Sequence, residues 1–155
     1  MENWKSRVYE SYMSNGFSSV HRMKDEFKRH EKYFKKNYLK FMPENKEAKI
    51  LELGCGMGHF FYFCKNAGYK NYEGIDASIE NIEFIKSKFG KDSQVSVNDI
   101  MLYLSEKRRG GVFDVVIFND VIEHLTKTEI FEVLEGIIKV LKIDGVLLIK
   151  TPNMA

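Results

Sequence analysis

Three glycines at every second position directly follow a short apolar segment at residues 50–53. Gly54, Gly56 and Gly58 form this loop, and an amphipathic segment begins at Phe60. Glycine has no Cβ atom, so its backbone can turn tightly and a ligand can approach it closely. The pattern predicts a buried strand, then a ligand-binding loop, then a helix.

Apolar segments alternate with amphipathic segments along the rest of the chain. Strands are expected at 48–53, 71–75, 94–97, 113–118 and 146–151. Helices are expected at 60–67, at 78–89 and from Thr126, which forms a capping box with Glu129. Strands separated by helices pair in parallel through right-handed crossovers. We therefore expect an open α/β sheet with a ligand crevice at the carboxyl ends of its strands.

The apolar positions also predict how these elements pack. The strand at 113–118 is apolar at consecutive positions, so we expect it at the centre of the sheet, covered on both faces. Asp144 and Gly145 are expected to turn the chain into the last strand. The helix side chains expected to face inward are Ile79, Ile82, Ile85 or Phe84, Ile130, Val133, Leu134, Ile137, Ile138 and Leu141.

The N-terminal part of the chain differs from the rest in charge. Residues 1–49 contain 12 Lys and Arg against 7 Asp and Glu, whereas residues 50–155 contain 12 against 15. The basic part is either a solvated helix face or a surface for an anionic acceptor such as RNA. Residues 1–47 are expected to form a helical cap segment, and residues 48–155 one structural unit. The apolar stripe of the cap helix is Val20, Met23, Phe27, Phe34, Tyr38 and Phe41.

Acidic residues stand at the ends of the second and third predicted strands. Asp76 comes 22 residues after Gly54, near the offset at which α/β folds bind a ribose diol. Asp99 can accept a hydrogen bond from the exocyclic amine of an adenine. Either residue taken alone could instead cap a helix. The third glycine comes one residue too early for a dinucleotide-binding fingerprint, which has its glycine where His59 stands.

These motifs resemble, in order and spacing, those of the class I S-adenosylmethionine-dependent methyltransferases. The likeness covers residues 48–153 and includes the segments at 113–125 and 141–153. The chain is similar to the small UbiG-like and polysaccharide-cluster types. The resemblance implies a Rossmann-like, open, mostly parallel sheet of about five strands with helices on both faces, preceded by N-terminal helices. The family's sheet normally adds an antiparallel pair after the fifth strand, so the chain is expected to be truncated at its C-terminus.

The resemblance also implies that the cofactor is S-adenosyl-L-methionine. It places the three glycines beside the methionine portion, Asp76 at the ribose hydroxyls, and Asp99 with the Ile100 backbone at the adenine. Glu52 lies behind the loop, and Asn119 or Asp120 lies near the amino acid end of the cofactor. The expected cofactor residues are Glu52, Gly54, Cys55, Gly56, Gly58, Asp76, Ala77, Asp99, Ile100, Asn119 and Asp120.

Methyl transfer from a sulfonium ion needs mainly an aligned acceptor, because the leaving group is already excellent. A base is needed only where the nucleophile must lose a proton, and Glu123 with His124 is the best-placed candidate. His124 could equally be a residue at a helix start that bonds the backbone. The Asp120, Glu123 and His124 pattern also resembles part of the metal site of small-RNA 2′-O-methyltransferases. Those enzymes need a further His downstream, so no metal is predicted here.

The predicted function is methyl transfer to oxygen on a glycan or small metabolite. The alternatives are RNA 2′-O-methylation with a divalent metal, and a non-catalytic cofactor-binding or interaction domain. No apolar run approaches the ~20 residues of a membrane-spanning helix, and the first residues contain no apolar signal core. We therefore expect a cytoplasmic protein without a membrane span. A homodimer could cover the exposed edge of the fifth strand.

Overall fold

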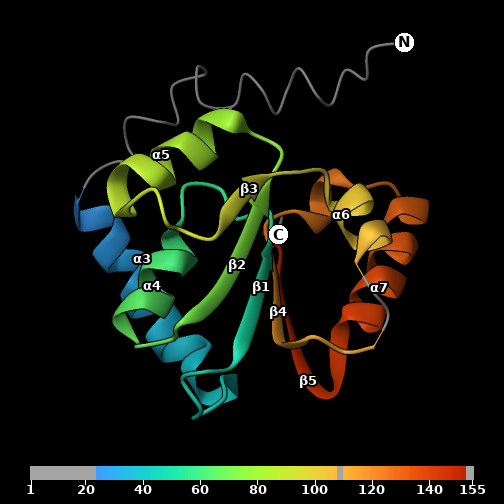
Figure 1. Ribbon diagram of the computed structural model, residues 1–155, viewed down its shortest axis with the longest axis horizontal. Helices are drawn as coiled ribbons and strands as arrows, with labels where there is room; N and C mark the ends of the chain where they lie inside the picture. The colour runs from blue at the N-terminus through green and yellow to red at the C-terminus, as the bar shows by residue number, and fades with distance from the viewer. Residues whose placement is uncertain (1–23, 108–109, 153–155) are drawn as a thin grey trace.

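One parallel five-stranded sheet forms the centre of the molecule. The computed structural model describes residues 24–107 and 110–152. The strands lie in the order β3-β2-β1-β4-β5, and every pairing is parallel (Figure 1). They are β1 (Lys49–Leu53), β2 (Asn71–Asp76), β3 (Val95–Val97), β4 (Phe113–Asn119) and β5 (Leu141–Lys150). The predicted Rossmann-like sheet is confirmed.

Helices cover both faces of this sheet, as predicted. The α-helices are α3 (Lys24–Asn37), α4 (His59–Asn66), α5 (Ile79–Phe89), α6 (Ile100–Glu106) and α7 (Lys127–Val140). Two short 3₁₀ helices, η2 (Leu39–Phe41) and η3 (Ile122–His124), follow α3 and β4. Figure 1 shows α3, α4 and α5 on one face and α6 and α7 on the other. No helix in the described ranges is long and apolar enough to cross a membrane.

The alternation of side chains along β4 supplies both halves of the core. Val115 and Ile117 lie in the cluster with α3, α4 and α5, and Val116 and Phe118 lie in the cluster with α6 and α7. All four are fully buried, because successive strand residues point to opposite faces. The strand is thus covered on both faces, as predicted. The prediction that it lies at the sheet centre is wrong, because β1 holds that place between β2 and β4.

This strand order determines where a ligand can bind. The chain adds β2 and β3 on one side of β1, then crosses back and adds β4 and β5 on the other side. The loops after β1 and β4 therefore diverge toward opposite faces of the sheet. In open α/β sheets, ligands bind at the carboxyl ends of the strands at this change of direction.

Several packing predictions are wrong in detail. Ile138 is 72% exposed although its neighbour Ile137 is fully buried, because adjacent residues point about 100° apart around a helix. Ile79 is exposed at the first position of α5. Phe41 is exposed because η2, after α3 has ended, does not continue the helical stripe. The stripe residues Val20 and Met23 lie outside the described residues.

Two further differences concern one helix and the last strand. The helix α6 was not predicted, although Asp99 caps it and apolar residues follow. Asp144 and Gly145 do not form a turn before the last strand but lie within β5. The pairing advances by two residues on β4 and by five on β5 between Phe113–Leu141 and Val115–Val146. The extra residues of β5 therefore bulge out of the pairing.

The described part of the N-terminal segment packs directly on the α/β core. The ring centroid of Phe34 in α3 lies 5.0 Å from that of Phe60 and 5.7 Å from that of Phe63, both in α4. Phe34, Tyr38 and Met42 belong to the same buried cluster as the strand residue Ile50. The division of the chain at residue 47 stays a prediction.

Candidate functional site

The glycine loop leaves the carboxyl end of β1 and leads directly into α4. Gly54, Gly56 and Gly58 have φ angles of 79°, 50° and 80°, a backbone region that side chains disfavour. The N–H groups of Gly54 and Cys55 both donate to the carbonyl oxygen of Ile75 in β2, at 2.9 Å each. The start of the loop is therefore bonded to the neighbouring strand.

The three glycines are required for different reasons. A Cβ atom at Gly54 would lie 2.5 Å from Cγ2 of Val121, and one at Gly58 would lie 2.9 Å from Cγ1 of Ile85. A Cβ atom at Gly56 would meet nothing within 4 Å. Gly54 and Gly58 thus permit close packing within the protein. Only Gly56 leaves open space beside the backbone, as a ligand-contacting glycine requires.

Asp76 at the end of β2 connects this loop to α5. Its Oδ2 accepts from the N–H of Gly56 at 2.8 Å, and its Oδ1 accepts from the N–H of Ser78 at 2.8 Å and from Nδ2 of Asn81 at 3.1 Å. The structure therefore brings Asp76 and the glycine loop together. A carboxylate has about four acceptor positions, so capacity remains on Oδ2 for a ligand. Ala77, the next residue, is exposed.

Glu52 and Cys55 lie in the core beneath the loop. Glu52 is 4% exposed, and the hydroxyl of Tyr72 donates to its Oε2. Burial raises the pKa of Glu52 to about 8; the hydrogen bond from Tyr72 acts against this shift, and the charge of Asp76 adds to it. Burial likewise raises the pKa of the Cys55 thiol. Glu52 is therefore mainly protonated at neutral pH and lies behind the loop.

The chain reaches Asp99 just after passing Asp76, because β3 pairs with β2 and Val97 is in register with Asp76. The N–H of Asn98 donates to the carbonyl oxygen of Asp76 at 3.0 Å. Oδ1 of Asp99 accepts from the N–H of Leu102 at 3.0 Å, so this residue caps α6. It is also exposed, and Ile100 is half-buried. The capping role is present, and the adenine-binding role stays a prediction.

The turn after β4 lies next to Gly54 and forms the wall of the candidate site that faces Asp76 and Asp99. Asp120 has a φ of 53°, the one positive value outside glycine among residues 24–107 and 110–152. Its N–H donates to the carbonyl oxygen of Lys150 at 2.7 Å, and its carboxylate pairs with Nζ of Lys150. Oδ1 of Asn119 accepts from the hydroxyl of Tyr38 at 2.7 Å. The sequence pattern did not single out Lys150, and it marked Tyr38 only as a core residue.

The candidate base residues follow this turn, in η3. Glu123 and His124 are both exposed. Oε2 of Glu123 accepts from Oγ1 of Thr151 at 3.3 Å, which links η3 to the end of β5. Their role as a base stays a prediction. The described residues contain no group of three His, Cys, Asp or Glu side chains placed to hold a metal ion.

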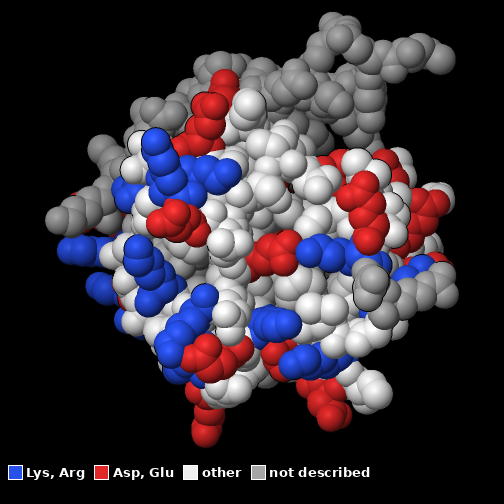
Figure 2. Space-filling view, viewed as in Figure 1, with Lys and Arg blue, Asp and Glu red and all other residues white. Residues whose placement is uncertain are grey.

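Charge is unevenly distributed over the surface of the molecule. Figure 2 shows Lys and Arg side chains gathered on the side of α3, α4 and α5, and Asp and Glu side chains on the side of α6 and α7. On α3, Lys28, Lys32 and Lys36 are all exposed at successive steps of four. Both interpretations of this basic side, a solvated face or a contact with an anion, stay open.

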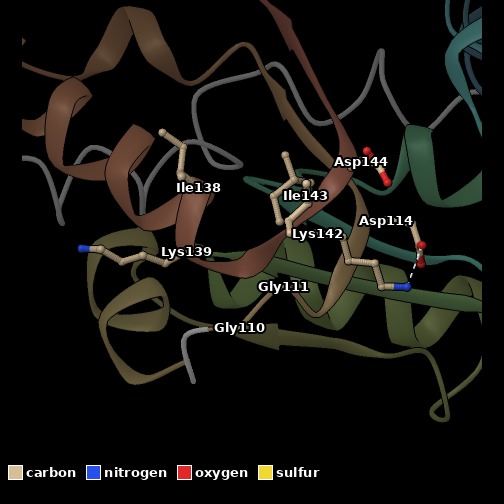
Figure 3. A pocket seen from close by; sticks show the side chains of 10 residues that line it. Gly110, Gly111, Asp114, Ile138, Lys139, Lys142, Ile143 and Asp144 are labelled. Carbon is tan, nitrogen blue, oxygen red and sulfur yellow. Dashed lines mark hydrogen bonds and ion pairs between the residues drawn. The ribbon is translucent and has the colours of Figure 1, made fainter.

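An open hollow of about 750 Å³ lies at the other end of the sheet, beside the start of β4 and the beginning of β5 (Figure 3). Its lining includes Ile138, Ile143 and Lys142, whose Nζ donates to Oδ1 of Asp114 at 2.7 Å. The glycine loop is at the carboxyl ends of the strands. The hollow is therefore separate from the candidate site.

Comparison with known proteins agrees with this geometry. A family model described as a methyltransferase domain matches residues 26–155. The ubiquinone biosynthesis O-methyltransferase of Rickettsia akari is 32% identical over 107 residues, 69% of this chain and 41% of that protein. The putative methyltransferase YqeM of Bacillus subtilis is 33% identical over 142 residues, 86% of this chain and 53% of that protein. The chain thus spans about half the length of these relatives.

Solved structures show the same fold. A SAM-dependent methyltransferase from Archaeoglobus fulgidus superposes with a TM-score of 0.72 at 24% identity, over 90% of this chain and 59% of that one. Magnesium protoporphyrin IX methyltransferase from Synechocystis with bound SAM gives 0.67 at 18% identity, over 92% and 74%. The chain therefore belongs to the methyltransferase domain family, among the class I S-adenosylmethionine-dependent methyltransferases.

Proposed function

We propose that this chain binds S-adenosylmethionine at the carboxyl ends of β1, β2 and β3 and transfers its methyl group to an oxygen of a glycan or small metabolite. The observation that carries the proposal is the glycine loop itself. Asp76 holds it through the Gly56 N–H, and the space beside Gly56 is open. The curated O-methyltransferases that the chain resembles support an oxygen acceptor.

The residues around the loop suit the three parts of this cofactor. Asp76 keeps acceptor capacity for ribose hydroxyls, and Asp99 presents an exposed carboxylate on the adjacent strand end. Asn119 accepts from Tyr38 through Oδ1, so its Nδ2 is the group left to donate to a ligand carboxylate. The carboxylate of Asp120 lies at the same end of the sheet and is paired with Nζ of Lys150. The carboxylates of Asp76 and Asp99 favour a positively charged ligand on this wall of the site, whereas the charge of Asp120 is already balanced by Lys150.

Catalysis on this chain then depends mainly on alignment. Bound S-adenosylmethionine would supply a methyl group on a positively charged sulfur that leaves readily. The protein's part is to hold the acceptor in line with that methyl group, which can contribute several kcal/mol. For a hydroxyl acceptor, we assign the role of base to His124 with Glu123, because both are exposed beside the β4 turn. Water can take the proton where the acceptor is already acidic.

Titration calorimetry with S-adenosylmethionine and S-adenosylhomocysteine tests the binding half of the proposal, with NAD as the comparison ligand. We expect saturable heat with the two sulfur nucleosides and none with NAD. A folded sample that gives no heat at millimolar S-adenosylhomocysteine refutes the proposal.

Turnover tests the second half. Transfer of a labelled methyl group to phenolic or sugar hydroxyls supports the proposed acceptor class. Transfer to RNA that requires manganese would instead support the RNA alternative, and binding without any transfer would support a non-catalytic domain.

A cytoplasmic location and a homodimer belong to the same proposal. In the sheet of the described residues, β5 pairs on one side only, with β4, and so presents an edge that another chain can cover. Size-exclusion chromatography with light scattering distinguishes a monomer from a dimer. Fractionation of cells tests the location.

A further inference from the structure

The turn after β4 lies tightly against the glycine loop. The position of a Cβ atom at Gly54 would be only 2.5 Å from Cγ2 of Val121, so the loop and the turn touch with no space between them. Groups that pack in direct contact cannot move independently. The position of Asn119 to Val121 therefore sets the width of the candidate cofactor site on this side.

Asp120 in this turn adopts a backbone conformation that needs support. Its φ of 53° is disfavoured for residues with a side chain, and such conformations persist where surrounding contacts hold them. Lys150 provides two such contacts. Its carbonyl oxygen accepts from the N–H of Asp120 at 2.7 Å, and its Nζ pairs with the carboxylate. Both come from one residue at the end of β5, paired in register with Asn119.

The other side of the turn is held by the N-terminal segment. The hydroxyl of Tyr38 donates to Oδ1 of Asn119. Burial raises the pKa of Tyr38, and nearby Tyr33, Asp120 and Glu52 raise it further, so it stays a hydrogen-bond donor. Nζ of Lys150 also lies 5.8 Å from the ring centroid of Tyr33 in α3. Elements from both ends of the described chain thus converge on this turn.

We propose that Lys150 is a positioning residue for cofactor binding, which holds Asp120 in its left-handed conformation and thereby keeps the β4 turn against the glycine loop. The inference rests on the proposed function, because it assumes that this loop binds the cofactor. Lys150 acts through Asp120 and is not assigned a contact with the cofactor.

The chain contains a matched control. Lys142 pairs with Asp114 at 2.7 Å, which also joins β5 to β4, but at the far end of the strands. Asp114 has no positive φ and lies away from the glycine loop. Loss of the Lys142 pair therefore removes a similar ion pair between the same two strands without changing the β4 turn.

The experiment compares Lys150→Met, Lys150→Arg and Lys142→Met with the wild type. The affinity for S-adenosylhomocysteine is measured by calorimetry well below the melting temperature of each variant. We expect Lys150→Met to weaken binding roughly five- to tenfold, the size of effect typical of coupled neighbours. Lys150→Arg should keep most of the affinity, and Lys142→Met should bind like the wild type.

A double substitution separates positioning from general stabilisation. Glycine adopts a positive φ without strain, so in an Asp120→Gly background Lys150→Met should cause little further loss of affinity. Binding by Lys150→Met equal to the wild type, or an undiminished effect of it in the Asp120→Gly background, overturns the inference. If the wild type itself does not bind S-adenosylhomocysteine, the proposed function fails. That result is distinct from the two outcomes that overturn the role of Lys150.

Discussion

The different requirements at the three glycines predict different effects of adding one methyl group. At Gly56 an added Cβ atom meets no protein atom within 4 Å, so Gly56→Ala should cost only the backbone strain of a positive φ, about 1–2 kcal/mol of unfolding free energy. At Gly58 the Cβ atom also meets Ile85 at 2.9 Å. Gly58→Ala should therefore destabilise the fold more than Gly56→Ala does.

Although Gly56→Ala should cost less stability than Gly58→Ala, we expect it to weaken ligand binding. A ligand atom in contact with the Gly56 Cα lies about 3.5–4 Å away, and an added Cβ atom takes up about 1.5 Å of that distance. The ligand must then shift, and we expect the dissociation constant for S-adenosylhomocysteine to rise roughly tenfold or more, about 1.4 kcal/mol. Calorimetry measures the binding, and urea unfolding measures the stability of each variant.

Gly68 provides the matched control for this experiment. It has a φ of 85°, its Cβ position is also empty within 4 Å, and it follows α4 at the end opposite the glycine loop. Gly68→Ala should lose about as much stability as Gly56→Ala and bind S-adenosylhomocysteine like the wild type. Equal affinities for Gly56→Ala and Gly68→Ala would refute the reasoning that Gly56 faces the ligand.

Three further predictions concern stability. Glu52 has a pKa of about 8 in the folded protein against 4.5 when unfolded, so the folded state binds more protons between these two values. The free energy of unfolding should therefore fall as the pH rises from 4.5 to 8, by at most about 1.4 kcal/mol per pH unit. Urea unfolding measures this pH dependence, and Glu52→Gln should remove it. Thr126→Ala breaks a capping box and should cost about 1 kcal/mol; thermal unfolding with no change in midpoint would contradict this. Ile137→Ala should cost about 2–5 kcal/mol, whereas Ile138→Ala, at a 72% exposed position, should change stability little in the same assay.

Local pattern was enough to predict the features that depend on neighbours in the chain. Thr126 with Glu129 caps α7, as expected, because these bonds span three residues. The glycine loop and Asp76 were also expected together, since consecutive strands of this alternating pattern tend to lie side by side. Neighbouring Ile137 and Ile138 could not be told apart, because both fit a broad apolar stripe.

The sequence by itself determined the strands, the loop and the acidic residues at the strand ends, since each follows from apolar periodicity or from glycine within a few residues. Only the tertiary structure decided that β1 is central, that Gly54 and Gly58 serve packing while Gly56 stays open, and that Lys150 and Tyr38 hold the β4 turn. Those contacts join residues 27 to 81 positions apart. Their partners are chosen by how the helices and strands pack in space, which spacing along the chain does not encode.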